Sequence, residues 1–217
     1  MGVIVPAILA PTTQGLVQQA AAVAPLSTLV SYDVAEEQFV GTSTPGPLEY
    51  PKLTPDRSVI WHLMVHEPVL HLPDCLSYPT HSIVVHAEAR GANEALAELR
   101  TGDVLGGLAI NVETPVEQIF PFLPDVDFVQ LMTVRPGGQG RPFEPAALTK
   151  IPELRAKREN LVIAIDGGVS PSTIATVARY RPDYVFVGSA LTSVEDPADA
   201  YRVLTQALEA ATSIREG

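Results

Sequence analysis

The sequence predicts an α/β fold, a (β/α)8 TIM barrel formed by residues 1–217 as a single domain. Short apolar runs rich in valine, isoleucine and leucine alternate with helical patterns along the chain, as consecutive β-α units require. These runs are apolar almost throughout, which is typical of strands buried on both faces of a parallel sheet. A chain of 217 residues, 46% of them hydrophobic, is long enough to close eight such units around a large core. The alternative, an open doubly wound sheet, would have fewer strands.

The elements follow one another in a regular order. The predicted strands are Val3–Leu9, Thr28–Asp33, Ser58–Val65, His81–His86, Leu105–Asn111, Phe128–Val134, Leu161–Asp166 and Tyr184–Gly188. The clearest helices are Gln14–Ala24, Ala92–Arg100, Ala146–Arg158, Ser172–Tyr180 and Ala198–Ala211. A serine or aspartate followed by proline stands just before each of the last two helices, which is a helix start signal.

The segment Val34–Arg57 departs from this rhythm. It contains Pro45, Pro47, Pro51 and Pro55. Prolines this close together exclude a long helix, because each lacks a backbone N–H and clashes with the preceding turn. The second helix of the barrel is therefore predicted to be short or missing.

Composition excludes several classes of function. The net charge of −11 argues against binding to nucleic acid or to an anionic membrane surface, so any phosphate must be bound by local donors. A lone cysteine, Cys75, excludes an internal disulfide and a cysteine-based zinc site. No apolar run reaches the ~18 residues that span a bilayer, and the N-terminus lacks the basic region of a signal peptide. A cytoplasmic location is expected.

Two predicted strands end in glycine. One runs directly into Asp166-Gly167-Gly168, and the last runs into Gly188-Ser189. Glycine lets backbone N–H groups approach a ligand closely, and the loops after strands 7 and 8 of such barrels commonly bind phosphate. The pair predicts a phosphorylated substrate with a carboxylate beside it.

Polar residues stand at the ends of most other strands as well. In a barrel the C-terminal ends of all strands meet at one mouth, where catalytic groups lie. The polar strand ends are Asp33, His62, His86, Asn111, Thr133, Asp166 and Ser189. Together they predict a site at the barrel mouth.

The chemistry of this set can be argued from Asp33 and Asp166, which lie on opposite sides of a narrow barrel. One carboxylate can remove a proton from a carbon and the other can return one to the opposite face, which inverts the centre. A divalent metal would stabilise the resulting enediolate, with His62 and both aspartates as its ligands. Met64 and Met132 either form an apolar lining over that metal or fill the barrel.

The loop after the sixth strand is rich in glycine. It contains Gly137, Gly138 and Gly140 between Arg135 and Arg141. It is predicted to fold over a phosphate.

These stretches together resemble the ribulose-phosphate 3-epimerase family, in order and over nearly the whole chain. The motifs that carry the resemblance are His62-Leu63-Met64-Val65 with Pro68, His86-Ala87-Glu88-Ala89, Ala109-Ile110-Asn111 with Thr114-Pro115, Leu131-Met132-Thr133-Val134 with Pro136-Gly137, Asp166-Gly167-Gly168 and Gly188-Ser189.

The resemblance implies a barrel of the ribulose-phosphate-binding type, an isomerase of the pentose phosphate pathway that interconverts D-ribulose 5-phosphate and D-xylulose 5-phosphate. It implies Asp33 and Asp166 as the acid/base pair. It also implies a divalent cation (Zn, Fe, Mn or Co) bound by Asp33, His62 and Asp166. The residues expected to contact the substrate or its phosphate are His62, Met64, Met132, Gly137, Gly138, Gly140, Gly167, Gly168, Gly188 and Ser189.

The departures from the family gather on the first two strands. Ser31 stands where the family has a metal-binding histidine, Ala7 where it has serine, and Ala35 where it has methionine. Serine is a poorer neutral ligand than imidazole for a transition metal, so weaker metal binding is expected. His66 or His71 would be the available substitutes.

Three hypotheses follow for the activity. The first is a working ketose 5-phosphate epimerase, because both aspartates and His62 are present. The second is a phosphosugar-binding barrel with impaired catalysis, because the first two strands have changed. The third is an epimerase for a different sugar phosphate, since those strands contact the non-phosphate end. Barrels of this kind often pair, which favours a homo-oligomer, most simply a dimer.

Overall fold

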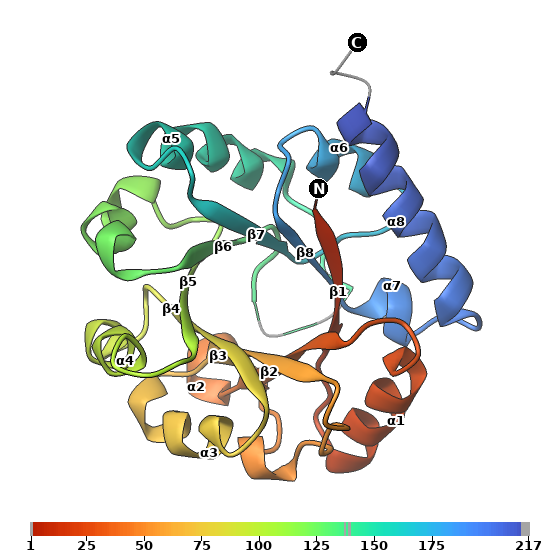
Figure 1. Cartoon of the computed structure of the whole chain (residues 1–217), viewed down its shortest axis with the longest axis horizontal. Coiled ribbons are helices and arrows are strands. Elements are labelled where there is room, and N and C mark those ends of the chain that lie inside the picture. Colours follow the sequence, from red (N-terminus) through yellow and green to blue (C-terminus); the bar gives the residue numbers. More distant parts are fainter. Residues whose placement is uncertain (1, 137, 139, 214–217) are drawn as a thin grey trace.

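Eight parallel strands form a closed barrel in sequence order, with β8 pairing back onto β1 (Figure 1). The computed structural model describes residues 2–136, 138 and 140–213. The strands are β1 (Val3–Ile8), β2 (Leu29–Ala35), β3 (Ser58–Met64), β4 (Thr80–His86), β5 (Leu105–Ile110), β6 (Phe128–Met132), β7 (Val162–Asp166) and β8 (Tyr184–Val187). The predicted fold class is confirmed, and the open sheet is excluded.

Helices and short 3-10 turns surround the barrel (Figure 1). The α-helices are α1 (Thr13–Val23), α2 (Glu37–Val40), α3 (Leu72–Leu76), α4 (Ala92–Leu99), α5 (Lys150–Lys157), α6 (Ile174–Ala178), α7 (Ser189–Thr192) and α8 (Pro197–Ser213). The 3-10 segments are η1 (Pro47–Glu49), η2 (Pro68–His71), η3 (Val116–Asp125) and η4 (Pro145–Thr149). Among the described elements, no helix is both long and apolar enough to cross a bilayer.

Proline lies at two of the differences between the predicted and the observed helices. The expected single helix Ala146–Arg158 is instead η4 followed by α5. Pro152 has no N–H to complete an α-helical bond to the preceding turn, so that turn is 3-10. The link between β5 and β6, for which no helix was predicted, is η3, and Pro121 and Pro124 lie within it.

The second helix is reduced to the four residues of α2, as predicted. An aromatic cluster of Tyr32, Tyr50, Trp61 and Tyr78 packs in its place, with ring centroids of successive members 4.9 to 5.3 Å apart. The Tyr50 hydroxyl donates a hydrogen bond to the backbone carbonyl of Asp33. The irregular segment therefore stabilises the end of β2.

Toward the N-terminal ends of the strands, the interior of the barrel is mostly apolar. Side chains from alternate positions of the strands form this layer, and they include Val5, Ile60, Phe128 and Phe186. A methyl group on Gly107 would come within 2.5 Å of the Phe128 ring, so only glycine fits there. This packed layer supports the polar side chains at the C-terminal ends of the strands.

Candidate metal centre and acid/base site

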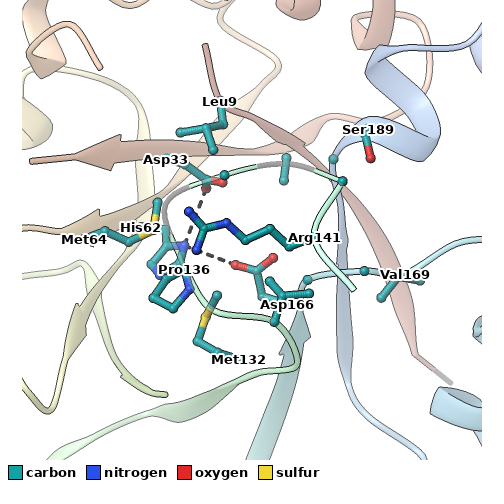
Figure 2. A pocket seen from close by; sticks show the side chains of 17 residues that line it. Leu9, Asp33, His62, Met64, Met132, Pro136, Arg141, Asp166, Val169 and Ser189 are labelled. Carbon is teal, nitrogen blue, oxygen red and sulfur yellow. Dashed lines mark ion pairs between the residues drawn. The ribbon is translucent and has the colours of Figure 1, made fainter. Parts of the chain in front are cut away.

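Asp33, His62 and Asp166 meet at the C-terminal mouth of the barrel (Figure 2). Asp33 lies opposite His62 in the register of β2 and β3, and Asp166 lies opposite Met132 in that of β7 and β6. The three polar side chains are buried, with exposed fractions of 6%, 0% and 9% in sequence order. Burial of two carboxylates requires a compensating cation or several hydrogen bonds.

The three side chains have the spacing of a metal site. The His62 Nδ1 atom lies 3.1 Å from Asp166 Oδ2 and 3.6 Å from Asp33 Oδ1, along the dashed lines of Figure 2. One ligand atom from each residue lies within 4.8 Å of the others. Ligand atoms about 2.0–2.2 Å from one transition-metal ion are separated by about these distances. One imidazole nitrogen and two carboxylate oxygens also suit a divalent cation, so the residues fit the metal that the sequence predicts.

The electrostatics of this group reflect the two acids. Burial alone would lower the pKa of His62, but its hydrogen bonds to Asp166 and Asp33 outweigh that effect and raise the pKa to about 9. Burial raises the pKa of Asp166, and the charge of Asp33 adds to the rise while the hydrogen bond to His62 opposes it. Without a metal, a protonated His62 therefore supplies the positive charge between the carboxylates.

Each carboxylate also accepts a hydrogen bond from a neutral buried donor. Ser31 Oγ donates to Asp33 Oδ1 at 2.9 Å, and Gln130 Nε2 donates to Asp166 Oδ2 at 2.8 Å. Sequence reasoning missed Gln130, which lies within an apolar strand. Its inward register, two residues before Met132, was the available signal.

His86 and Glu88 lie behind His62. The Nε2 atoms of the two histidines are 2.8 Å apart, and His86 Nδ1 lies 3.3 Å from Glu88 Oε2. Both imidazoles are fully buried. The sequence marked His86 as a strand end but did not indicate this contact.

His66 and His71, the expected substitutes for the missing ligand, are placed elsewhere. The His66 backbone N–H donates to Glu36 Oε2, and His71 Nε2 lies 3.2 Å from Glu36 Oε1. Neither belongs to the candidate metal group.

The predicted phosphate-binding and apolar residues line the same small cavity as the acids. Met64 and Met132 are almost fully buried at its wall. Gly167 and Gly168 have φ values of 110° and 65°, a backbone conformation that disfavours other residues. The cavity of about 50 Å³ is also lined by Gly138, Gly140, Gly188 and Ser189. Gly137 lies outside the described residues.

Arg141 is an addition to the predicted site. Figure 2 shows its guanidinium pointing into the cavity between Asp33 and Asp166. Its Nη1 donates to the Arg135 carbonyl at 3.2 Å. Ligand pockets usually have volumes of about 300–1,000 Å³, so this side chain takes up space that a sugar phosphate would need.

Solved structures of low sequence identity share the fold. The 3-hexulose-6-phosphate synthase from Salmonella typhimurium has a TM-score of 0.71 at 16% identity, over 96% of this chain and 99% of that chain. KGPDC from Streptococcus mutans has a TM-score of 0.69 at 13% identity, over 97% of this chain and 99% of that chain. At these identities the likeness concerns the barrel fold alone.

Sequence comparison identifies the family. The family model for the ribulose-phosphate 3 epimerase family matches residues 3–192. Ribulose-phosphate 3-epimerase 2 from Cupriavidus necator is 33% identical over 85% of this chain and 81% of its own length. The ribulose-phosphate 3-epimerase of Mycobacterium tuberculosis (strain H37Rv) is 31% identical over 96% and 94%, and that of Schizosaccharomyces pombe is 31% identical over 77% and 76%. The chain therefore belongs to the ribulose-phosphate 3-epimerase family and is an epimerase.

Proposed function

We propose that the chain inverts C3 of a ketose 5-phosphate and interconverts D-ribulose 5-phosphate and D-xylulose 5-phosphate. The observation that carries this proposal is the arrangement of Asp33 and Asp166 in one cavity with His62 between them. Relatives named ribulose-phosphate 3-epimerase, at 31–33% identity, support the same substrate.

In the proposed reaction, the carboxylates of Asp33 and Asp166 act on opposite faces of C3. One carboxylate takes the C3 proton, the C–H electron pair forms the C2–C3 double bond, and the C2 carbonyl oxygen becomes negative. The carboxylic acid on the other side then returns a proton to the opposite face, and the carbonyl re-forms. The raised pKa of Asp166 makes its carboxylate a stronger base than an exposed aspartate.

Asp33, His62 and Asp166 are the proposed ligands of a divalent cation, one of Zn, Fe, Mn or Co. When bound, such an ion supplies Lewis-acid stabilisation of negative charge beside C3. Met64 and Met132 keep this end of the cavity apolar, which excludes water from a reactive enediolate.

The phosphate is proposed to bind at the opposite end of the cavity. Backbone N–H groups of glycines can approach its oxygens closely, and the Ser189 hydroxyl is an additional donor. The proposed contacts come from Gly138, Gly140, Gly167, Gly168, Gly188 and Ser189.

The direct test is incubation of metal-loaded protein with D-ribulose 5-phosphate in deuterated water. We expect D-xylulose 5-phosphate to form with deuterium at C3. Tight binding without product or deuterium would support the impaired barrel instead. Exchange with another ketose phosphate, and none with this one, would identify a different substrate.

The serine at position 31 gives a second prediction. Ser31 is buried, points at Asp33 and faces the small side chain of Ala7 in the register of β1 and β2. Ser31→His should add a nitrogen ligand and raise zinc affinity at least ~10-fold, as measured by competition with a chelator.

Ser31→Ala is the matched control, since it removes the hydroxyl without adding a ligand. It should leave zinc affinity unchanged or slightly lower. Equal zinc affinities for the histidine and alanine variants would contradict the assigned position of the missing ligand.

A further inference from the structure

We propose that His86 and Glu88 are positioning residues that fix the tautomer of His62, so that its Nδ1 lone pair faces the metal ion. The inference rests on the metal site of the proposed function. It adds a series of hydrogen bonds that begins at His62 and ends at the loop that follows β5.

The series of hydrogen bonds begins at His62, the proposed metal ligand. His62 Nδ1 faces Asp33 and Asp166, so its other ring nitrogen, Nε2, points away from the carboxylates toward His86. The two rings lie in planes only 16° apart, and their Nε2 atoms are separated by 2.8 Å. At that distance one nitrogen must donate a proton and the other must accept it.

Glu88 decides which nitrogen donates. Burial raises the pKa of its carboxyl, but hydrogen bonds from His86, Thr114 and the Asn111 amide outweigh this and lower the pKa to about 2. The carboxylate can only accept, so the His86 nitrogen that faces it, Nδ1, must carry a proton.

The protonation of His86 then follows. Its Nδ1 holds a proton that faces Glu88, and the 2.8 Å gap between the two Nε2 atoms has room for only one more; two carboxylates face His62 and one faces His86, so that further proton stays on His62 and His86 holds one. With that proton on Nδ1, its Nε2 is the acceptor, and the shared proton belongs to His62 Nε2. A neutral His62 therefore keeps its lone pair on Nδ1, facing the carboxylates.

Glu88 is itself held in place. Its Oε1 accepts a hydrogen bond from the Asn111 backbone N–H at 3.0 Å and another from the Thr114 hydroxyl. The loop that supplies these donors is tied down by Lys150 at the start of α5. Its Nζ donates to the carbonyls of Asn111, Val112 and Thr114 at 2.7–2.8 Å. Each member thus orients the next, as outer partners of metal-bound histidines commonly do.

This orientation matters more here than in a site with four protein ligands. With Ser31 in place of a histidine, His62 is the one nitrogen donor of the candidate group. A His62 tautomer with its proton on Nδ1 could not bind the ion without turning over, and the ring is fully enclosed.

The first test needs no substitution. Long-range 15N–1H NMR of the zinc-loaded protein, labelled with 15N in its histidines, distinguishes a ring bound through Nδ1 from one bound through Nε2. We expect His62 to be bound through Nδ1 with a slowly exchanging Nε2–H. Coordination through Nε2, or failure of the wild-type protein to bind zinc, would overturn the proposal.

The second test uses variants of His86 and measures zinc affinity in the absence of sugar. His86→Leu removes the acceptor and should weaken zinc binding about 10–100-fold. His86→Gln offers an amide oxygen to His62 Nε2 and should recover much of that loss. Equal affinities of wild type and His86→Leu would also overturn the proposal.

His81→Gln is the matched control, since His81 lies on the same strand outside the candidate site and should not change affinity. If His86→Leu does not fold, Glu88→Ala replaces it, since the Glu88 side chain is partly exposed. This variant should also weaken zinc binding. Because neither test uses substrate, failure of the deuterium experiment would reject the proposed reaction and leave this inference standing. Conversely, the NMR or zinc-affinity experiment can contradict this inference while the deuterium experiment still supports the proposed reaction.

Discussion

Asp166→Asn should lower the rate of epimerisation by about 10³-fold while leaving phosphate affinity nearly unchanged, because general acid–base groups contribute factors of this order. The amide cannot take or return the C3 proton. Gln130 can still donate to the amide oxygen that replaces Asp166 Oδ2, so the local packing is retained. The measurement is turnover at saturating sugar, together with the dissociation constant of inorganic phosphate.

The control for this experiment is Asp56→Asn, a substitution in the exposed loop that precedes β3, which should change neither quantity. Asp33→Asn should lower turnover about as much as Asp166→Asn, since one carboxylate must remove a proton from C3 and the other must return one to the opposite face. Loss of phosphate binding together with turnover would show that Asp166 supports the phosphate end of the cavity instead.

Metal affinity should depend steeply on pH. His62 has a pKa of about 9 in the metal-free protein, so below that pH a proton must leave before Nδ1 can bind an ion. Apparent affinity should therefore rise with pH by about tenfold per unit, or about 100-fold between pH 6 and pH 8, and level off above pH 9.

Chelator competition at several pH values, corrected for protonation of the chelator, measures this dependence. Calorimetry in two buffers of different ionisation enthalpy should show the release of close to one proton per ion at pH 7. A flat profile, or no proton release, would mean that His62 is neutral before the metal binds, contrary to the ion pairs in the site.

The strands and the principal acids were predictable because their signals are local. Buried parallel strands are continuous apolar runs, and parallel topology brings their C-terminal ends to one mouth. Asp33, His62 and Asp166 could therefore be brought together without knowing any distance. The reduced second helix was predictable for the same reason, since proline acts on its own turn.

The remaining features depend on contacts across the barrel. Gln130 reads as part of an apolar strand until the register places it beside Asp166. The pairing of His86 with His62 joins strands whose relative stagger no local pattern specifies. Arg141 points into the cavity from a loop outside the strands, a placement that no local pattern specifies (Figure 2). The single helix predicted at Ala146–Arg158 was wrong, because Pro152 favours a change from 3-10 to α geometry within that stretch.

The aromatic cluster that replaces the second helix contains the protein's one tryptophan, so tryptophan fluorescence reports on this part of the barrel. Trp61 is the single tryptophan of the chain, and it precedes His62 on the same strand with its ring on the opposite face. Its ring packs against Tyr50, whose hydroxyl bonds the Asp33 backbone. Emission excited at the red edge of the absorption band therefore reports on the side of the barrel beside the acid pair, while circular dichroism averages over all eight strands. If the fluorescence and circular dichroism transitions coincide during unfolding, the part of the barrel around Trp61 unfolds together with the remaining strands.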